Sequence, residues 1–295
     1  MKNGVVIINK EKGLTSQAVV SRVKRLFGVE KAGHTGTLDP MATGVLPVLV
    51  GRGVKASEFM LTGDKHYIAT LTLGLTTDTE DITGEVLSHS DVAVTEEEVR
   101  AAVAGFVGDY MQTPPMYSAL KVGGKKLCDL ARRGVTVERE ARPVRIYSIG
   151  VQRIDEKNYT LDVVCSKGTY IRTLCADIGA GLGVGGVMST LCRAEAAGFT
   201  LDSALTLGEL EALTPEERDD RIVPVSYIFR SLPTVILSDF FSRLAHSGLE
   251  IYLSKIGFRA DVGTRVAVCD KDGFFAVGEV REYESGLAIK PIRQF

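Results

Sequence analysis

The chain has 295 residues, a net charge of −2 and 45% hydrophobic residues, which is enough apolar side chain for one large domain, or for a large and a small one. Residues 4–8 form an apolar run too short for a signal peptide, and no run approaches the roughly 20 residues of a membrane span. The five cysteines include no Cys-x-x-Cys pair, so we expect reduced thiols in a cytoplasmic protein. Composition therefore argues against a membrane-spanning protein and against a disulfide-stapled secreted one.

Positive charge gathers in two segments, although the whole chain is slightly acidic. Residues 1–60 carry nine Lys and Arg against four Asp and Glu, and residues 118–172 carry twelve against six. If these segments lie side by side, they form a positive face of the kind that binds a phosphate backbone. Ordinary solvated surface explains such runs equally well, so charge alone leaves nucleic-acid binding open.

The chain opens with a predicted strand at residues 5–9. A helix follows from the Thr-Ser pair at residues 15–16, because apolar residues then recur at helical spacing until Gly28 ends the pattern. The basic side chains of this helix fall mostly off its apolar stripe. They are therefore available to solvent or to phosphate.

Residues 33–44 read Gly-His-Thr-Gly-Thr-Leu-Asp-Pro-Met-Ala-Thr-Gly and favour a loop, since glycine opens positive φ and proline fixes φ. Asp39 directly precedes Pro40, which pushes Asp39 out of the helical region. Residues 45–50 follow as a continuous apolar run, typical of a buried strand. A carboxylate on a stiff loop beside a buried strand suits a functional site, whereas an Asp-Pro pair taken alone is more often an Asx turn.

The middle of the chain predicts more strands and short helices. Residues 65–73 alternate between apolar and polar, as a half-buried strand does, with Tyr67 on the apolar face. The acidic residues 76–91 lack the spacing of a calcium loop and are predicted to be a solvated loop. Thr95 and Glu98 form a capping box that opens a helix.

Basic residues concentrate around a predicted turn and short helix between residues 121 and 133, which we expect to contact phosphates. Two alternating runs, residues 144–154 and 159–165, predict a hairpin. The second run leads into a helix with Arg172 in its first turn, where an arginine usually forms a surface salt bridge. The glycine tract at residues 179–186 ends that helix and lacks the strand before it and the helix after it that a dinucleotide site needs.

The pattern as a whole predicts an α+β fold. Its large domain, residues 1–229, is a mostly antiparallel extended sheet with helices packed on it. After about residue 230 the apolar runs become shorter and predict a small β unit, so we expect residues 230–295 to form a second domain.

Several sequence blocks resemble the TruB family of tRNA pseudouridine-55 synthases, within the pseudouridine synthase superfamily. The block at residues 33–44 is similar to the catalytic signature of that family. The likeness continues in Lys-His-Tyr at residues 65–67, Met-Tyr-Ser-Ala-Leu-Lys at 116–121 and Cys-Ser-Lys-Gly-Thr-Tyr-Ile-Arg at 165–172. It covers roughly residues 4–200, and these blocks together are far more specific than any short pattern.

The resemblance implies roles for particular residues. Asp39 is the catalytic carboxylate and Arg172 its ion-pair partner. Tyr67 stacks on the target uracil and is close enough to its C5 to accept a proton. The remaining residues implied to bind substrate are His34, which fills the gap left by the flipped base, Tyr170 and Leu191, which line the uracil pocket, and Lys10, which supports the loop.

Lys10 stands at a point where this chain departs from the family pattern. Family members usually read Lys-Pro-x-Gly there, and Glu11 replaces the proline. The small C-terminal unit corresponds to a PUA-like RNA-binding domain in the family.

The implied activity is the isomerisation of uridine to pseudouridine at position 55 in the T loop of tRNA, with possible assistance to tRNA folding as a second role. This reaction needs no cofactor and no metal. A charged Asp39 is required, and an arginine partner lowers the pKa of a carboxyl by roughly 1–3 units. Attack on C6 of uracil and attack on C1′ of the ribose both remain open.

Two other function classes compete with this interpretation. An RNA-folding chaperone could use the same groove without chemistry, but it would not need both Asp39 and Arg172. A metabolic nucleotide-binding enzyme would need a phosphate loop, and the glycine tract lacks that context. An RNA-guided relative would need protein partners and a different tail. We therefore expect a monomer with tRNA as its partner, no obligate protein partner and no membrane association.

Overall fold

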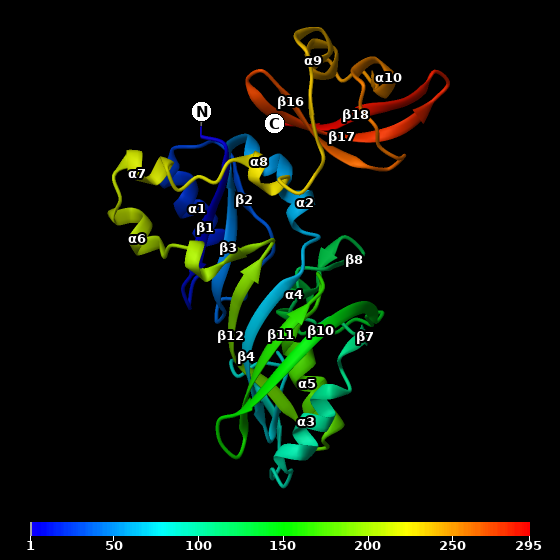
Figure 1. Ribbon diagram of the computed structural model, residues 1–295. Helices are drawn as coiled ribbons and strands as arrows, with labels where there is room; N and C mark the ends of the chain where they lie inside the picture. Colours follow the sequence, from blue (N-terminus) through cyan, green and yellow to red (C-terminus); the bar gives the residue numbers. More distant parts are fainter. Residues whose placement is uncertain (1) are drawn as a thin grey trace.

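The structure is a computed structural model that describes residues 2–295. It contains two sheets at opposite ends of the molecule, with the C-terminal sheet at the top of Figure 1. The large sheet has the order β1-β3-β12-β4-β11-β10-β7, with β2 pairing on β3 and β13 on β12. Its strands are β1 (Gly4–Lys10), β2 (Ala32–His34), β3 (Thr43–Val50), β4 (Lys65–Leu73), β7 (Gly108–Gln112), β10 (Arg142–Arg153), β11 (Asn158–Cys165), β12 (Gly186–Ala196) and β13 (Phe199–Thr200).

The pairing between β3 and β12 is parallel, and the other strand pairings of this sheet, within residues 2–295, are antiparallel. The predicted α+β class with a mostly antiparallel sheet is therefore confirmed. Two small hairpins stand apart from the sheet: β5 (Leu75–Thr77) with β6 (Val86–His89), and β8 (Lys121–Val122) with β9 (Lys125–Lys126).

One face of the large sheet carries the main apolar core. Helices α1 (Ser16–Phe27), α3 (Glu96–Ala104) and α5 (Ile171–Gly181) bury their apolar sides in this core, α1 against β2 and β3, α3 against β10, and α5 against β4 and β12. The caps of α1 and α3 confirm the sequence predictions, since Thr15 accepts a hydrogen bond at the start of α1 and Thr95 and Glu98 form the capping box of α3. Short helices fill the connections: η1 (Gly51–Ala56), α2 (Ser57–Met60), α4 (Leu127–Ala131), η2 (Leu201–Ser203), α6 (Leu207–Ala212), α7 (Pro215–Asp219) and α8 (Val225–Ile228).

The C-terminal sheet has the order β14-β16-β17-β18-β15 and an apolar core of its own. The predicted boundary at residues 229 and 230 falls between α8 and β14. The elements are β14 (Thr234–Ile236), α9 (Asp239–His246), β15 (Ile251–Tyr252), α10 (Leu253–Ile256), β16 (Arg265–Asp270), β17 (Gly273–Tyr283) and β18 (Gly286–Gln294).

The prediction of a solvated loop at residues 76–91 is confirmed in its exposure, since residues 85–91 are exposed, and wrong in its form and at Asp81. The segment forms the β5–β6 hairpin, and the loop between its strands folds back so that Asp81 is only 5% exposed. The burial of Asp81 could not be predicted from the sequence, because acidic residues normally indicate solvated surface. Here the buried Arg172 pairs with the Asp81 carboxylate in the interior. The strand β12, which the sequence analysis did not predict, lies between β3 and β4.

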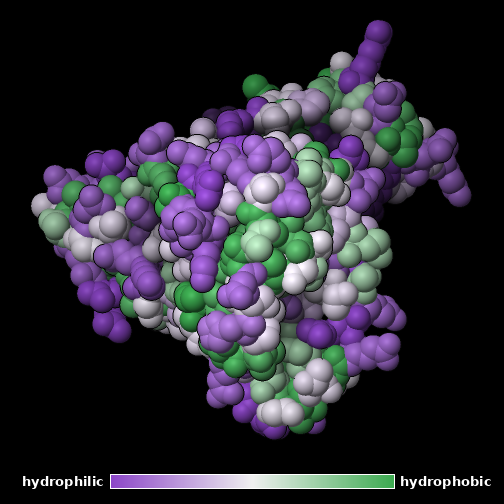
Figure 2. Space-filling model, turned by 90° about the horizontal axis from the view of Figure 1, so that it is seen from below, coloured by the Kyte–Doolittle hydropathy of each residue, from purple (hydrophilic) through white to green (hydrophobic). Residues whose placement is uncertain are grey.

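Seen from below, the surface over α6 and α7 is mostly hydrophilic, while hydrophobic side chains gather nearer the middle of this face (Figure 2). Among residues 2–295 the longest apolar helices fall short of the length and hydropathy needed to cross a bilayer.

An aromatic cluster joins the two sheets. Phe229 stacks on Phe274 with ring centroids 5.4 Å apart, meets Phe59 edge-on at 5.0 Å and packs against Phe295 at 5.5 Å. The guanidinium of Arg293 adds a salt bridge of 2.6 Å to Glu58 in α2. The C-terminal sheet is thus fixed to the segment α2 that leads directly into β4.

Replacing the central ring of this cluster should destabilise the protein strongly. Phe229 is 4% exposed, so Phe229→Ala removes a fully packed ring and should cost about 3–5 kcal/mol. Urea unfolding followed by circular dichroism measures the change. Phe240, which is 57% exposed, provides the control, because Phe240→Ala should change the free energy of unfolding by no more than about 0.5 kcal/mol. Equal losses for the two variants would contradict the role given to the cluster.

Candidate active site

Asp39 lies in the loop between β2 and β3, and the backbone of that loop is held from two sides. The Ser16 hydroxyl at the start of α1 accepts the Leu38 N–H at 2.9 Å and donates to the Leu38 carbonyl at 3.1 Å. The Lys10 ammonium donates to the carbonyls of Ala42 at 2.5 Å and Pro40 at 3.3 Å. The loop that presents Asp39 is therefore rigid, as its glycines and proline predicted.

Lys10 itself is fully buried, and burial lowers its pKa to about 8, with Asp39 opposing that shift. Its third hydrogen bond goes to the Glu11 carbonyl at 3.1 Å, so all three ammonium donors are used inside the protein. Lys10 does not line the pocket described below. Its position supports the loop and leaves no donor free for substrate.

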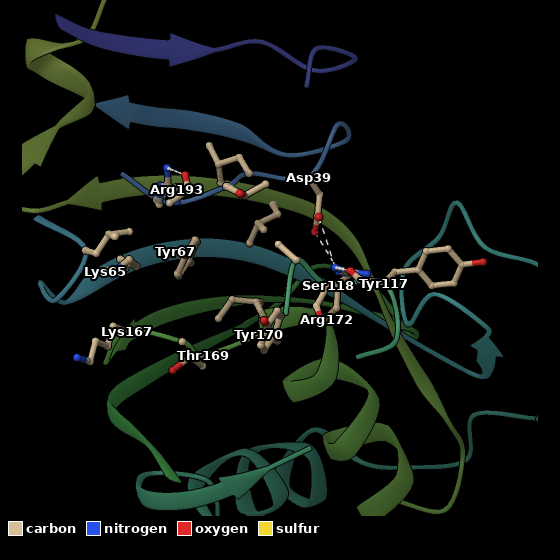
Figure 3. A pocket seen from close by; sticks show the side chains of 18 residues that line it. Asp39, Lys65, Tyr67, Tyr117, Ser118, Lys167, Thr169, Tyr170, Arg172 and Arg193 are labelled. Atoms are coloured by element: carbon tan, nitrogen blue, oxygen red, sulfur yellow. Dashed lines mark hydrogen bonds and ion pairs between the residues drawn. The ribbon is translucent and has the colours of Figure 1, made fainter. Parts of the chain in front are cut away.

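Arg172, in the first turn of α5, meets Asp39 across the pocket (Figure 3). Its Nε lies 3.0 Å from Asp39 Oδ2, and its Nη2 donates to the Tyr117 carbonyl at 2.7 Å. Nη1 donates to the Thr79 carbonyl at 3.1 Å. The Arg172 side chain is 6% exposed and that of Asp39 33% exposed. The arginine is thus part of the protein interior, while the carboxylate faces the cavity.

A second carboxylate lies behind the arginine. Asp81 Oδ2 is 3.8 Å from Arg172 Nη1, and its other oxygen, Oδ1, accepts the backbone N–H of Thr83 at 2.9 Å and the hydroxyls of Thr83 and Thr79. One guanidinium thus faces two carboxylates, and Asp81 acts on Asp39 as a like charge. The sequence analysis missed Asp81. Its signal in the sequence is a threonine two residues before it and another two residues after it, whose hydroxyls can donate hydrogen bonds to the carboxylate.

The pKa of Asp39 differs from the sequence-based expectation. Burial raises it above the usual range of an aspartate, Arg172 opposes that shift, and the negative charge of Asp81 adds to it. The expectation of a net decrease was wrong because it counted the arginine and left out desolvation, which favours the neutral acid in a dry site. Arg172 therefore limits the increase and does not reverse it.

The cavity beside this ion pair has a volume of about 270 Å³. Leu191 lines it from β12. Tyr67, on the neighbouring strand β4, and Tyr170, just before α5, also line it (Figure 3). Five of the seven predicted site residues thus line one pocket. The lining residues are Gly36, Thr37, Leu38, Asp39, Leu61, Lys65, Tyr67, Tyr117, Ser118, Ala119, Lys167, Gly168, Thr169, Tyr170, Ile171, Arg172, Leu191 and Arg193.

His34 lies outside this lining, at the end of β2, where it pairs with Val48. Its Nδ1 is buried, and within residues 2–295 it has no hydrogen-bond partner. Burial lowers the pKa of His34, and the charge of Arg193 lowers it further. At neutral pH the ring is therefore uncharged, as a side chain that stacks between bases would need to be.

Three cations surround the end of the pocket opposite Asp39. Arg193 is 1% exposed, and its Nε donates to the Val45 carbonyl at 2.8 Å. Burial lowers the pKa of Lys65, and Arg193 lowers it further, whereas Lys167 is exposed at the rim. The sequence analysis assigned no role to Arg193. The sequence does carry a signal for its position in the pocket. Side chains alternate along a strand, so Arg193 lies on the same face of β12 as Leu191.

Tyr67 is 7% exposed, and burial raises the pKa of its phenol, against the opposing charge of Arg193. The ring is therefore a neutral phenol at physiological pH. It can stack on a base, but because it is not a phenolate it can take up a proton at its oxygen only if its own hydrogen passes to another acceptor.

The site thus combines a carboxylate, its arginine and an aromatic ring around a cavity large enough for a base. Residues 24–171 match the family model described as the N-terminal domain of TruB family pseudouridylate synthases, and residues 172–233 match the tRNA pseudouridylate synthase B C-terminal domain. The chain belongs to the TruB family of pseudouridylate synthases.

Named relatives agree with this assignment. The tRNA pseudouridine synthase B of Alkaliphilus oremlandii is 46% identical, over 95% of this chain and 93% of its own. That of Burkholderia pseudomallei is 44% identical, over 97% and 95%. Among solved structures, one in a Cbf5–Nop10–Gar1 complex matches 99% of this chain and 85% of its own, with a TM-score of 0.75 and 27% identity. Another, from an H/ACA RNP bound to a substrate RNA containing 2′-deoxyuridine, has a TM-score of 0.74 and 25% identity.

Removing the arginine should raise the pKa of Asp39 still further. Arg172→Met deletes the largest influence that opposes burial, so the carboxyl should titrate at higher pH than in the unmodified protein. Carbon-13 NMR of aspartate-labelled protein measures this directly, and Asp39→Asn identifies the resonance. An unchanged or lower titration midpoint in Arg172→Met would contradict the electrostatic account of the pair.

Proposed function

We propose that this protein converts uridine to pseudouridine at position 55 in the T loop of tRNA. The observation that carries the proposal is the pocket in which Asp39 and Arg172 face Tyr67 across a cavity large enough for a pyrimidine. Membership of the TruB family and the names of the relatives support tRNA as the substrate. The position in the T loop follows from the family resemblance of the motif around Asp39.

The reaction rearranges bonds without net oxidation or hydrolysis. The bond between N1 of uracil and C1′ of ribose breaks, the base turns, and C5 bonds to C1′. C5 then loses its hydrogen as a proton, and N1 takes up a proton. A pocket for this reaction must expose a carboxylate to the nucleotide, hold the detached base and exclude water that would trap the intermediate.

Asp39 is the nucleophile in this proposal, acting either at C6 of the base or at C1′ of the ribose. Arg172 opposes the rise in the Asp39 pKa that burial causes. Tyr67 stacks on the uracil and relays the C5 proton: its oxygen takes up that proton while its own hydrogen passes to an acceptor that returns a proton to N1. Tyr170 and Leu191 enclose the base and exclude water.

The target uridine must first leave the RNA stack, at a cost of a few kcal/mol. We infer that His34 replaces it there, since His34 stands two residues before Gly36 of the pocket lining and carries an uncharged ring. The basic side chains of residues 121–133 and Lys167 suit contacts with the phosphates on either side.

We also propose a division of labour between two domains. Residues 1–229 form the catalytic domain, and residues 230–295 form a PUA-like domain that contacts RNA outside the T loop. The protein acts as a monomer in the cytoplasm, without an obligate protein partner.

Loss of the carboxylate charge should abolish the reaction. Asp39→Asn keeps the size of the side chain but removes the nucleophile, so the single-turnover rate should fall by at least about 10⁴-fold. The assay measures tritium released from [5-³H]uridine-labelled tRNA, with tRNA binding measured in parallel. If both proteins bind tRNA and neither releases tritium, the chaperone function gains support. Equal release from both would mean that Asp39 is not at the reaction centre.

The two roles of Tyr67 can be separated by substitution. Tyr67→Phe keeps the stacking ring and loses the proton acceptor, for which we expect a decrease of roughly 10²–10⁴-fold in the single-turnover rate. Tyr67→Leu loses both roles and should be slower still. A Tyr67→Phe variant as fast as the unmodified protein would exclude the phenol oxygen from proton transfer.

A further inference from the structure

The side chain of Gln112 holds the backbone of Tyr170 through two hydrogen bonds. Gln112 ends β7 and is 1% exposed. Its Nε2 donates to the Tyr170 carbonyl at 2.9 Å, and its Oε1 accepts the Tyr170 N–H at 2.7 Å. A primary amide presents a donor and an acceptor side by side. Gln112 therefore pairs with Tyr170 much as a neighbouring strand residue would.

Tyr170 is a position on which the placement of Arg172 depends. It is the N-cap of α5, in an extended conformation at φ −101° and ψ 110°, and its own side chain forms no capping bond. Its carbonyl also accepts the Leu174 N–H at 3.1 Å, which begins the helix. Because Arg172 follows two residues later, a rotation of the Tyr170 backbone would move the guanidinium relative to Asp39. The same rotation would move the Tyr170 ring in the pocket.

We propose that Gln112 is a positioning residue for uridine isomerisation. Its amide fixes the start of α5 and thereby sets the Arg172 guanidinium and the Tyr170 ring against Asp39. The inference rests on the proposed function. Gln112 is not among the residues that line the pocket, so it acts through its neighbours and takes no part in bond making.

A second contact between the same two elements provides a matched control. Tyr110 lies two residues before Gln112 on β7, and its hydroxyl donates to Asp177 further along α5. Neither residue lines the pocket. Tyr110→Phe therefore removes one hydrogen bond between β7 and α5, and the contact of that hydroxyl with the Gln112 side chain, but keeps both hydrogen bonds between Gln112 and Tyr170. It should lower the melting temperature and leave the reaction rate unchanged.

The first test uses Gln112→Met, which keeps the length of the side chain and removes both hydrogen bonds. A misplacement of about 1 Å in a reacting site costs roughly 10²-fold in rate, so single-turnover tritium release from labelled tRNA should fall by about that factor. The affinity for tRNA should stay unchanged, because the phosphate contacts lie elsewhere. Melting temperatures of both variants show whether lost stability accompanies the lost rate.

The second test uses Gln112→Glu and its dependence on pH. A protonated carboxyl has one O–H donor and one carbonyl acceptor, the same pattern as the amide, whereas the ionised form has acceptors only. Burial favours the protonated form, which brings its titration toward an accessible pH. The rate of Gln112→Glu relative to the unmodified protein should therefore rise as pH falls, by roughly tenfold per pH unit above the pKa of the introduced carboxyl. Taking the ratio cancels the titration of Asp39.

Recovery of Gln112→Glu at low pH, with a slow Gln112→Met and a normal Tyr110→Phe, supports the proposal. A Gln112→Met protein that folds and reacts at the normal rate overturns it. So does a Gln112→Glu protein that reacts as fast as the unmodified protein at a pH where carbon-13 NMR shows the introduced carboxyl to be ionised, and this second arm decides the question even if Gln112→Met fails to fold. Absence of tritium release from the unmodified protein would instead remove the proposed function itself.

Discussion

The buried guanidinium of Arg172 is the constraint on which the rest of the site depends. At 6% exposure its charge cannot be solvated by water, so the protein must supply every partner. It does so with the carboxylates of Asp39 and Asp81 and with the carbonyls of Thr79 and Tyr117. Breaking a buried pair by removing one partner typically costs about 3–5 kcal/mol. Three segments far apart in sequence are therefore held together around one side chain.

These three segments explain why the fold has its particular connections. Asp39 is carried by the loop before β3, Asp81 by the hairpin loop after β5 and Tyr117 by the segment after β7. The parallel pairing of β3 and β12 brings the Asp39 loop beside β4 and its Tyr67. Burial strengthens each interaction in the pocket, and it also raises the pKa of the carboxylate that must be ionised for reaction. Arg172 and the partial exposure of Asp39 both limit this rise in the pKa of Asp39.

Much of this could be predicted from sequence. The strand β4 follows from its alternation, and α1 from its caps and apolar spacing, because local propensity and burial agree there. The motif around Asp39 located the carboxylate that faces the pocket, and the resemblance supplied Arg172 and Tyr67, which line the same pocket. The direction of the Asp39 pKa could not be predicted, since desolvation depends on neighbours that only the tertiary structure brings together.

The residues that sequence reasoning missed share a physical cause. Asp81 and Arg193 are charged side chains in the interior, and a charge in sequence normally indicates solvated surface. Each is buried because a tertiary partner satisfies it, Arg172 for the first and the Val45 carbonyl for the second. Gln112 was missed for a similar reason. Nothing in its strand indicates that its amide pairs with Tyr170, which lies 58 residues later at the start of α5.

The most direct test of the central claim is a crystal structure of the Asp39→Asn protein bound to a T stem-loop RNA. The account predicts that the target uridine is flipped into the cavity, with its ring stacked on Tyr67. Its C6 or C1′ should then lie about 3–3.5 Å from the side chain at position 39, a distance suited to attack. A uridine that remains stacked in the RNA, or that is bound away from the Asp39–Arg172 pair, would contradict the account.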